Sequence, residues 1–102
     1  MTYHVGGIDF PTKKAATEHA RSVLYRWPPK LPIHGPDAVF IRDLLTHHPF
    51  AEDKIGGGVH TVFIDFGDYG HRHFNVRRVD GTVDNFSIKQ CVGALIESEG
   101  VA

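Results

Sequence analysis

The side chains best suited to bind phosphate gather in the second half of the chain. The basic and histidine residues of this cluster are Arg72, Arg77, Arg78, Lys89, His71 and His73. Alternate residues of a strand share a face, so one side of an extended segment could contact a phosphate backbone, with Tyr69 available to stack on a base. Nearby carboxylates could instead pair with the arginines across the strands. These carboxylates are Asp65, Asp68, Asp80 and Asp84.

A lysine followed by a glycine run precedes this cluster. Residues 54–58 are Lys-Ile-Gly-Gly-Gly, and their backbone amides, with one ammonium group, could bind an anion. The segment lacks the GK[ST] ending of a P-loop, and it precedes a predicted strand instead of a helix. Glycines in such a place also relieve backbone strain. Lys54, Gly56, Gly57 and Gly58 are therefore candidate phosphate contacts without being a nucleotide-binding fingerprint.

The eight histidines support a second hypothesis, a metal-dependent nuclease or another phosphodiester enzyme. Candidate ligands are His47, His48, His60, His71, His73, Asp65 and Asp68. The sequence contains no CxxC or HExxH pattern, and nothing in it fixes a third or fourth ligand. No metal site and no cofactor is therefore assigned.

Composition and charge limit the range of functions. The chain has 102 residues, a net charge of −1 and a single cysteine. This length predicts one domain over residues 1–102, and the charge excludes a global attraction to nucleic acid. One cysteine cannot form an internal disulfide, and no apolar run could span a membrane. With no signal peptide recognisable, we expect a cytoplasmic protein that makes no membrane contact.

Apolar spacing predicts two helices in the first half of the chain. Residues 3–10 favour a strand, which Gly6-Gly7 should make short or bulged. Helical spacing extends over residues 12–26 and again from about Pro36 to His47. A proline-rich connector, Pro28–Pro36, joins them. The predicted core residues of these helices are Ala16, Ala20, Val23, Leu24, Trp27, Phe40, Ile41, Leu44 and Leu45.

Strands and a final helix are predicted in the second half. A loop over residues 49–58 leads into two alternating segments, residues 59–66 and 71–79. Asp80-Gly81 favours a two-residue turn with positive φ at both positions, before a short return strand. The resulting order, β-α-α-β-β-β-α, predicts an α+β fold with a small antiparallel sheet and helices packed on one face.

The last helix has the clearest local signature. Ser87 and Gln90 match a capping box, in which each side chain bonds the backbone amide of the other residue. Phe86 and Cys91 fit a hydrophobic staple, so Cys91 is expected to be a buried apolar residue instead of a nucleophile. The predicted apolar stripe comprises Ile88, Cys91, Val92, Leu95 and Ile96, and Gly100 is expected to end the helix.

Four motifs in order, LLTHHP, KIGGGV, FNVRRVDG and NFSIKQC, resemble the DCL family, named for "defective chloroplasts and leaves". The resemblance covers about residues 40–96. Matched positions are His48, Pro49, Lys54, Ile55, Gly56, Gly58, Arg77, Asp80, Gly81, Phe86, Ser87 and Cys91. Two positions depart from the family pattern. Asn85 stands where the pattern has an aspartate, and Gln90 where it has a lysine, so catalysis resting on either position is not expected here.

The resemblance implies an association with RNA. Plant members of the family act in chloroplast ribosomal RNA processing, and a similar domain ends the largest subunit of a plant-specific RNA polymerase. We therefore expect a non-enzymatic module that binds RNA or a ribonucleoprotein, in ribosomal RNA processing or a transcription-linked process. Its phosphate contacts would be the lysine–glycine segment and the basic cluster, with His48, His71 and His73 as additional contacts. A module that binds a protein through the exposed sheet face remains the other alternative.

Overall fold

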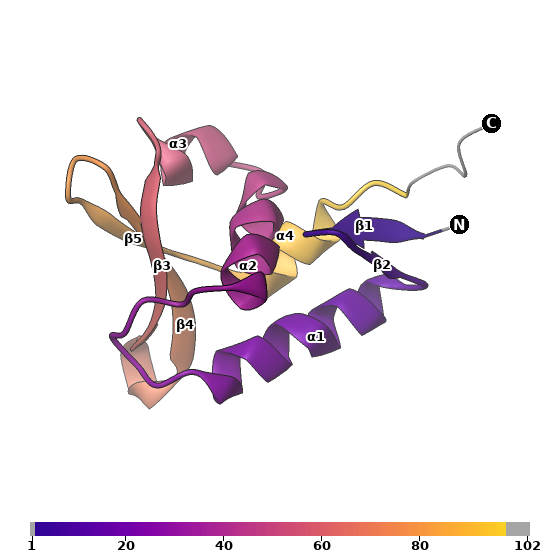
Figure 1. The fold of residues 1–102 in the computed structure, drawn as a ribbon, viewed down its shortest axis with the longest axis horizontal. Coiled ribbons are helices and arrows are strands. Elements are labelled where there is room, and N and C mark those ends of the chain that lie inside the picture. Colours follow the sequence, from indigo (N-terminus) through magenta and orange to yellow (C-terminus); the bar gives the residue numbers. More distant parts are fainter. Residues whose placement is uncertain (1, 98–102) are drawn as a thin grey trace.

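Two antiparallel sheets and four α-helices build the fold, and the computed structural model describes residues 2–97. The elements are β1 (Tyr3–Val5), β2 (Ile8–Phe10), α1 (Lys13–Arg26), α2 (Pro36–Thr46), α3 (Ala51–Ile55), β3 (Val59–Phe66), the 3-10 turn η1 (Asp68–Gly70), β4 (Arg72–Arg78), β5 (Val83–Phe86) and α4 (Ile88–Gly93). The predicted α+β class is confirmed, with helices on one face of the main sheet (Figure 1).

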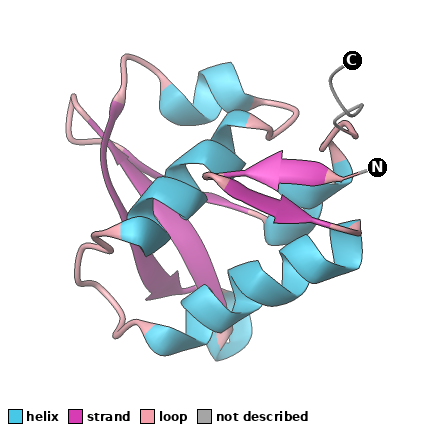
Figure 2. Cartoon of the chain, turned by 45° about the vertical axis from the view of Figure 1, so that its right-hand side comes forward, coloured by secondary structure: helices cyan, strands magenta, loops and turns pink. Residues whose placement is uncertain are grey.

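The main sheet has the strand order β3-β4-β5, and all its pairings are antiparallel. Its inner face carries buried side chains from each strand, with Ile64 opposite Phe74 and Phe74 opposite Phe86. The rings of Phe74 and Phe86 stack with centroids 5.8 Å apart. Helices α1, α2 and α4 lie on this side (Figure 2). Burial of the two apolar surfaces against each other supplies the main stabilisation.

The first two helices bury the residues that their spacing predicted. The fully or nearly buried ones are Ala16, Ala20, Val23, Leu24, Phe40, Ile41, Leu44 and Leu45. Trp27 is only partly buried, and its indole nitrogen donates a hydrogen bond to Asp37 at 2.8 Å. Helix α1 begins where predicted, since Thr12 accepts a hydrogen bond from the amide of Ala15.

The proline-rich connector lies along the free edge of β3. Lys30 donates its amide to the carbonyl of Ile64 at 2.6 Å, and Ile33 donates to Val62 at 2.9 Å. An exposed strand edge could otherwise pair with another chain, so the connector protects this side of the sheet. Lys30 adopts a φ of +70°, a conformation that few non-glycine residues take.

The amino-terminal segment forms a hairpin instead of one short strand. Gly6 and Gly7 have φ values of +58° and +83°, which suit the two central positions of a tight hairpin turn. Gly6 also lies so close to α2 that a Cβ there would approach Phe40 Cα to 2.6 Å. Its amide donates to the carboxylate of Asp43 at 2.7 Å, which attaches the hairpin to α2.

Two further local differences separate the structure from the sequence prediction. Residues 51–55, predicted as loop, form the short helix α3. In the turn after β4, φ is positive at Gly81 but not at Asp80, so the predicted two-residue turn is wrong. The amide of Gly81 bonds to Arg78 and that of Arg78 to Thr82, which leaves three residues in the loop.

The last helix is shorter than predicted. Helix α4 ends at Gly93, and the amide of Leu95 turns back to the carbonyl of Val92 at 3.1 Å. Both Leu95 and Ile96 lie beyond the helix; Leu95 is buried as expected, but Ile96 is 86% exposed and does not extend the apolar stripe. Gly100, the predicted end of the helix, lies outside the described residues. Glycine has low helix propensity, which explains an end at Gly93.

Candidate anion-binding site

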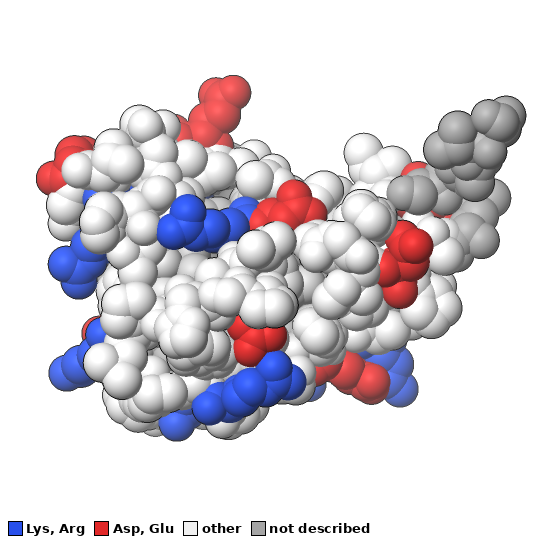
Figure 3. Space-filling model, viewed as in Figure 1, with Lys and Arg blue, Asp and Glu red and all other residues white. Residues whose placement is uncertain are grey.

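A groove with a volume of about 440 Å³ lies between α1, β4 and the start of α4. Arg21, Arg72 and Lys89 line it, and the lining residues include no acidic side chain within residues 2–97. The groove therefore brings together three predicted phosphate contacts, Arg72, His73 and Lys89, and adds Arg21. Acidic and basic side chains intersperse on the face seen in Figure 3, so positive potential is local, as the net charge of −1 requires.

Arg72 is held in place by the end of α1. Its Nη1 donates to the carbonyls of Leu24 at 3.2 Å and Trp27 at 2.9 Å. These carbonyls have no partner within the helix, and a cation beside them opposes the negative end of the helix dipole. Among the described residues no acceptor occupies its Nε or Nη2, so the guanidinium is fixed while part of it stays available to a ligand.

A polar stripe of α1 forms one wall of the groove. Lys13, Thr17, Arg21 and Tyr25 occur at intervals of four residues and thus share one helical face. Thr17 and Arg21 line the groove, and Lys13 donates to the carbonyl of Gly93 at its other end, at 2.8 Å. Sequence reasoning missed Arg21, although this spacing, opposite the apolar stripe, was the signal that could have identified it.

The opposite wall begins where β5 turns into α4. Ser87 accepts a hydrogen bond from the amide of Gln90 at 3.3 Å, which confirms this half of the predicted capping box. Lys89 follows in the first turn and is exposed. The pairing of β4 with β5 ends at Phe74, which leaves His73 without a partner residue on β5. His73 lines the groove, and its ring lies against Gly67. His71, the other predicted histidine of this strand, is exposed and does not line the groove.

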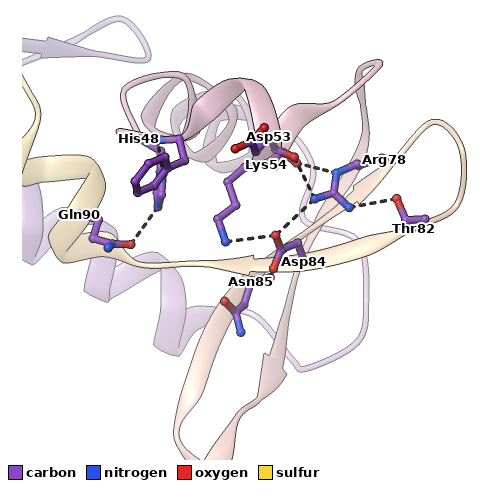
Figure 4. Close-up of polar contacts among 9 residues, drawn as sticks. His48, Asp53, Lys54, Arg78, Thr82, Asp84, Asn85 and Gln90 are labelled. Atoms are coloured by element: carbon purple, nitrogen blue, oxygen red, sulfur yellow. Dashed lines mark hydrogen bonds and ion pairs between the residues drawn. The ribbon is translucent and has the colours of Figure 1, made fainter.

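Lys54 and Arg78, two other predicted phosphate contacts, belong to a different cluster (Figure 4). Both bind Asp84, at 3.1 Å from Lys54 Nζ and 3.3 Å from Arg78 Nη2. Arg78 also donates to the carbonyls of Lys54 and Asp53, at 2.9 and 3.1 Å, and to the hydroxyl of Thr82 at 3.0 Å. Each of its three nitrogens thus has an acceptor, and the side chain connects α3 to the β4–β5 hairpin.

The electrostatics of Asp84 reflect these contacts. Partial burial raises the pKa of its carboxyl group, but the hydrogen bond and charge of Lys54 act in the opposite direction. The backbone amide of Asn85 and the charge of Arg78 lower it further, so the pKa of Asp84 lies below its ordinary value. The carboxylate is ionised at neutral pH and neutralises part of the predicted basic cluster.

The glycine run, residues 56–58, packs against Arg78 and Val79 beside this network. The amides of Gly56 and Gly58 donate to the carbonyls of Glu52 and Ile55, at 2.8 and 3.1 Å. Two of the three predicted anion-binding amides are therefore engaged, and only that of Gly57 has no backbone acceptor among the described residues. Gly56 has a φ of +57°, and a Cβ there would lie 3.0 Å from Arg78 Cδ. These glycines allow close packing against the hairpin.

His48 is buried, with only 4% of its surface exposed. Its Nδ1 accepts from the amide of Phe50 at 2.9 Å, so Nε2 carries the proton and donates to the Gln90 side chain at 3.0 Å (Figure 4). Gln90 thus contacts His48 instead of completing the capping box. Both ring nitrogens are occupied, so the predicted phosphate contact at His48 has no free donor.

Arg77 lies on the outer face of the sheet. Its guanidinium lies over the ring of Phe63, 5.5 Å from the centroid. Lys30 and His60 lie with it around a second depression of about 280 Å³. The predicted alternation is therefore confirmed, because Arg77 and Arg72 are on opposite faces. Consequently the five cations of the predicted set are divided among three places in the fold.

The predicted metal ligands are dispersed. Within residues 2–97, no group of three or more histidine, cysteine or carboxylate side chains is arranged to hold a metal ion. Cys91 is fully buried, and burial raises the pKa of its thiol to about 12, in agreement with a small apolar role. None of the helices within the same residues has the length and apolar character that crossing a membrane requires.

Comparison with known proteins provides the family assignment. The family described as a protein of unknown function, DUF3223, matches residues 21–92. The chain belongs to the DUF3223 family. This segment includes Arg21, Arg72 and Lys89 of the groove and the whole Lys54–Arg78–Asp84 network. Membership supports the predicted DCL-like resemblance at the level of the family.

Two relatives extend the comparison. Protein EMBRYO DEFECTIVE 514 of Arabidopsis thaliana is 30% identical over 94 residues, which cover 90% of this chain and 46% of that protein. The chain thus spans about half the length of the plant relative. A solution NMR structure of an uncharacterized protein from Rhodospirillum rubrum is 33% identical, with a TM-score of 0.80, and covers 86% of this chain and 85% of that one. The DUF3223 fold is therefore shared by a solved structure.

Proposed function

We propose that this DUF3223 protein is a non-enzymatic module that binds RNA, or an RNA–protein assembly, in ribosomal RNA processing or a transcription-linked process. The observation that supports this proposal is the groove in which Arg21, Arg72 and Lys89 converge without an acidic side chain among its described lining residues. Three cations that share a concave surface repel one another unless an anion neutralises them. A phosphate backbone supplies several negative charges at once.

The groove narrows the set of expected phosphate contacts. Arg72, Lys89 and His73 stay in the set, and Arg21 joins them. Lys54 and Arg78 already bind Asp84, which makes the network between α3 and the hairpin a supporting structure instead of a contact surface. Arg77 occupies the outer face of the sheet. A substitution there tests whether RNA binds in the groove or on that outer face.

Binding of a labelled RNA, followed by fluorescence anisotropy over a range of salt concentrations, tests the proposal. The Arg21→Glu/Lys89→Glu double variant should weaken binding strongly and lower the salt dependence. The slope of log K should fall by about 0.7 for each single-strand phosphate that the variant no longer neutralises. Both side chains are exposed and outside the core, so the fold should be retained.

The matched control is Lys14→Glu combined with Arg77→Glu. It makes the same change in net charge, at an exposed site on α1 and on the outer sheet face, away from the groove. Equal weakening by both double variants would mean that only net charge matters. Absence of binding to RNA by the unmodified protein would overturn the proposal and favour a protein partner.

A further inference from the structure

Exposed aromatic side chains border the basic groove at the Arg72 end. Tyr25 is 71% exposed and Phe66 is 52% exposed, so both rings are accessible to a ligand. Tyr25 belongs to the polar stripe of α1, one turn after Arg21. Phe66 ends β3, directly opposite Arg72 on β4. Exposed rings and groove cations therefore meet at one edge of the molecule.

Arg72 connects the rings with the groove. Its Cζ lies 5.8 Å from the centroid of Tyr25 and 5.8 Å from that of Phe66, within the range of cation–π attraction. The same guanidinium is fixed by the carbonyls at the end of α1. The two rings therefore flank a fixed cation, and Tyr69, 98% exposed, lies in the turn that joins β3 to β4.

We infer that the groove takes single-stranded RNA, whose phosphates contact Arg21 and Lys89 while unpaired bases stack on Tyr25 and Phe66. This inference rests on the proposed function, and it names the form of nucleic acid. Proteins that bind single strands combine a basic groove with aromatic rings, because every base presents a π-face. In a duplex the bases are stacked on each other and cannot reach such rings.

Three probes distinguish the alternatives with the unmodified protein. They are a labelled oligoribonucleotide of about 14 nucleotides, the same strand carrying abasic sites, and an RNA hairpin of equal phosphate number whose loop is abasic, so that all its bases are paired. The abasic strand keeps its phosphates but has no bases to stack. We expect the intact strand to bind about tenfold or more tightly than the abasic strand, and more tightly than the hairpin.

The Tyr25→Leu/Phe66→Leu double variant assigns the effect to these rings. It should lower affinity for the intact strand about tenfold, to the level of the abasic strand, and leave binding of the abasic strand unchanged. Leucine keeps an apolar side chain beside Arg72. Tyr69→Leu, in the exposed turn, is a second variant that tests whether this ring also stacks on a base. An equal reduction in affinity for both strands would mean that the variant disturbs Arg72 instead of stacking.

The experiments distinguish failure of RNA binding, of the preference for single strands and of the assignment to Tyr25 and Phe66. If neither strand nor the hairpin binds, the proposed function itself is overturned. Equal binding of intact and abasic strands, or tighter binding of the hairpin, would overturn the single-strand inference and leave RNA binding standing. A preference for the intact strand that survives the Tyr25→Leu/Phe66→Leu change would overturn the assignment to these two rings.

Discussion

Two basic regions of this protein contain the same residue types and differ in what surrounds them. In the Lys54–Arg78–Asp84 network, both cations share one carboxylate, and Arg78 also binds two carbonyls and a hydroxyl. In the groove, Arg21 and Lys89 have no carboxylate partner among the described residues, and the hydrogen bonds of Arg72 go to carbonyls. Acceptors supplied by the fold therefore decide whether a cation supports structure or faces a ligand.

The largest effect that would test this difference is expected at Arg78. Arg78→Ala should lower the free energy of unfolding by about 2–3 kcal/mol, because the carboxylate of Asp84 and two carbonyls would be left without this donor. Urea denaturation followed by circular dichroism measures the change. A cost below that of replacing an ordinary surface residue would show that the network does not hold α3 to the hairpin.

A smaller effect on stability is expected at Asp84, whose side chain is 40% exposed. Asp84→Asn should cost about 1 kcal/mol at neutral pH, because solvent screens the two ion pairs. Since the folded-state pKa of Asp84 is lowered, its contribution is complete above the unfolded pKa and is lost as the pH falls through the folded one. The difference between wild type and variant should therefore shrink below about pH 4.

Asp80 also has a lowered pKa, mainly because its carboxylate accepts hydrogen bonds from Thr82. Since wild type and the Asp84→Asn variant both contain Asp80, its contribution cancels from the difference between them. Unfolding curves at a series of pH values give the measurement. A difference that stays constant down to acidic pH would show that ionised Asp84 makes no net contribution to stability through Lys54 and Arg78.

The smallest effect on stability is expected in the groove. Arg21→Ala and Lys89→Ala should each change the free energy of unfolding by less than about 0.5 kcal/mol, because neither side chain is buried or paired among the described residues. Under the same urea conditions, a destabilisation as large as that of Arg78→Ala would remove the distinction between the two regions and make the groove cations structural.

Much of the fold was predictable because it depends on local patterns. The apolar spacing of α1 and α2 identified their buried faces, and Ser87 identified the start of α4. The alternation predicted for residues 71–79 places Arg72 and Arg77 on opposite faces of the sheet, as the structure has them. The hairpin at Gly6-Gly7 was missed because two adjacent glycines suit a tight turn as well as a bulge, and the sequence cannot distinguish these before the segment is packed against α2.

The candidate site was predicted only in part. Arg72 and Lys89 were identified as basic residues of one segment, but Arg21 lies far from them in sequence, on a helix that carries little of the family resemblance. Gln90 was expected to cap its own helix and instead contacts His48, 42 residues away. Spacing places Arg21 on the polar stripe of α1, but it does not show that this stripe faces Lys89 or that Gln90 faces His48, because each contact depends on how two distant elements pack.

By itself, the sequence determined the α+β class, the buried faces of the longer helices and the positions of the cations along the chain. These follow from periodicity and capping, which act over a few residues. Only the tertiary structure decided which cations are neutralised and which converge. Arg72 meets the end of α1 across 48 residues, and Arg78 meets Asp84 across a turn. Electrostatic interactions depend on distance in space, and packing sets that distance.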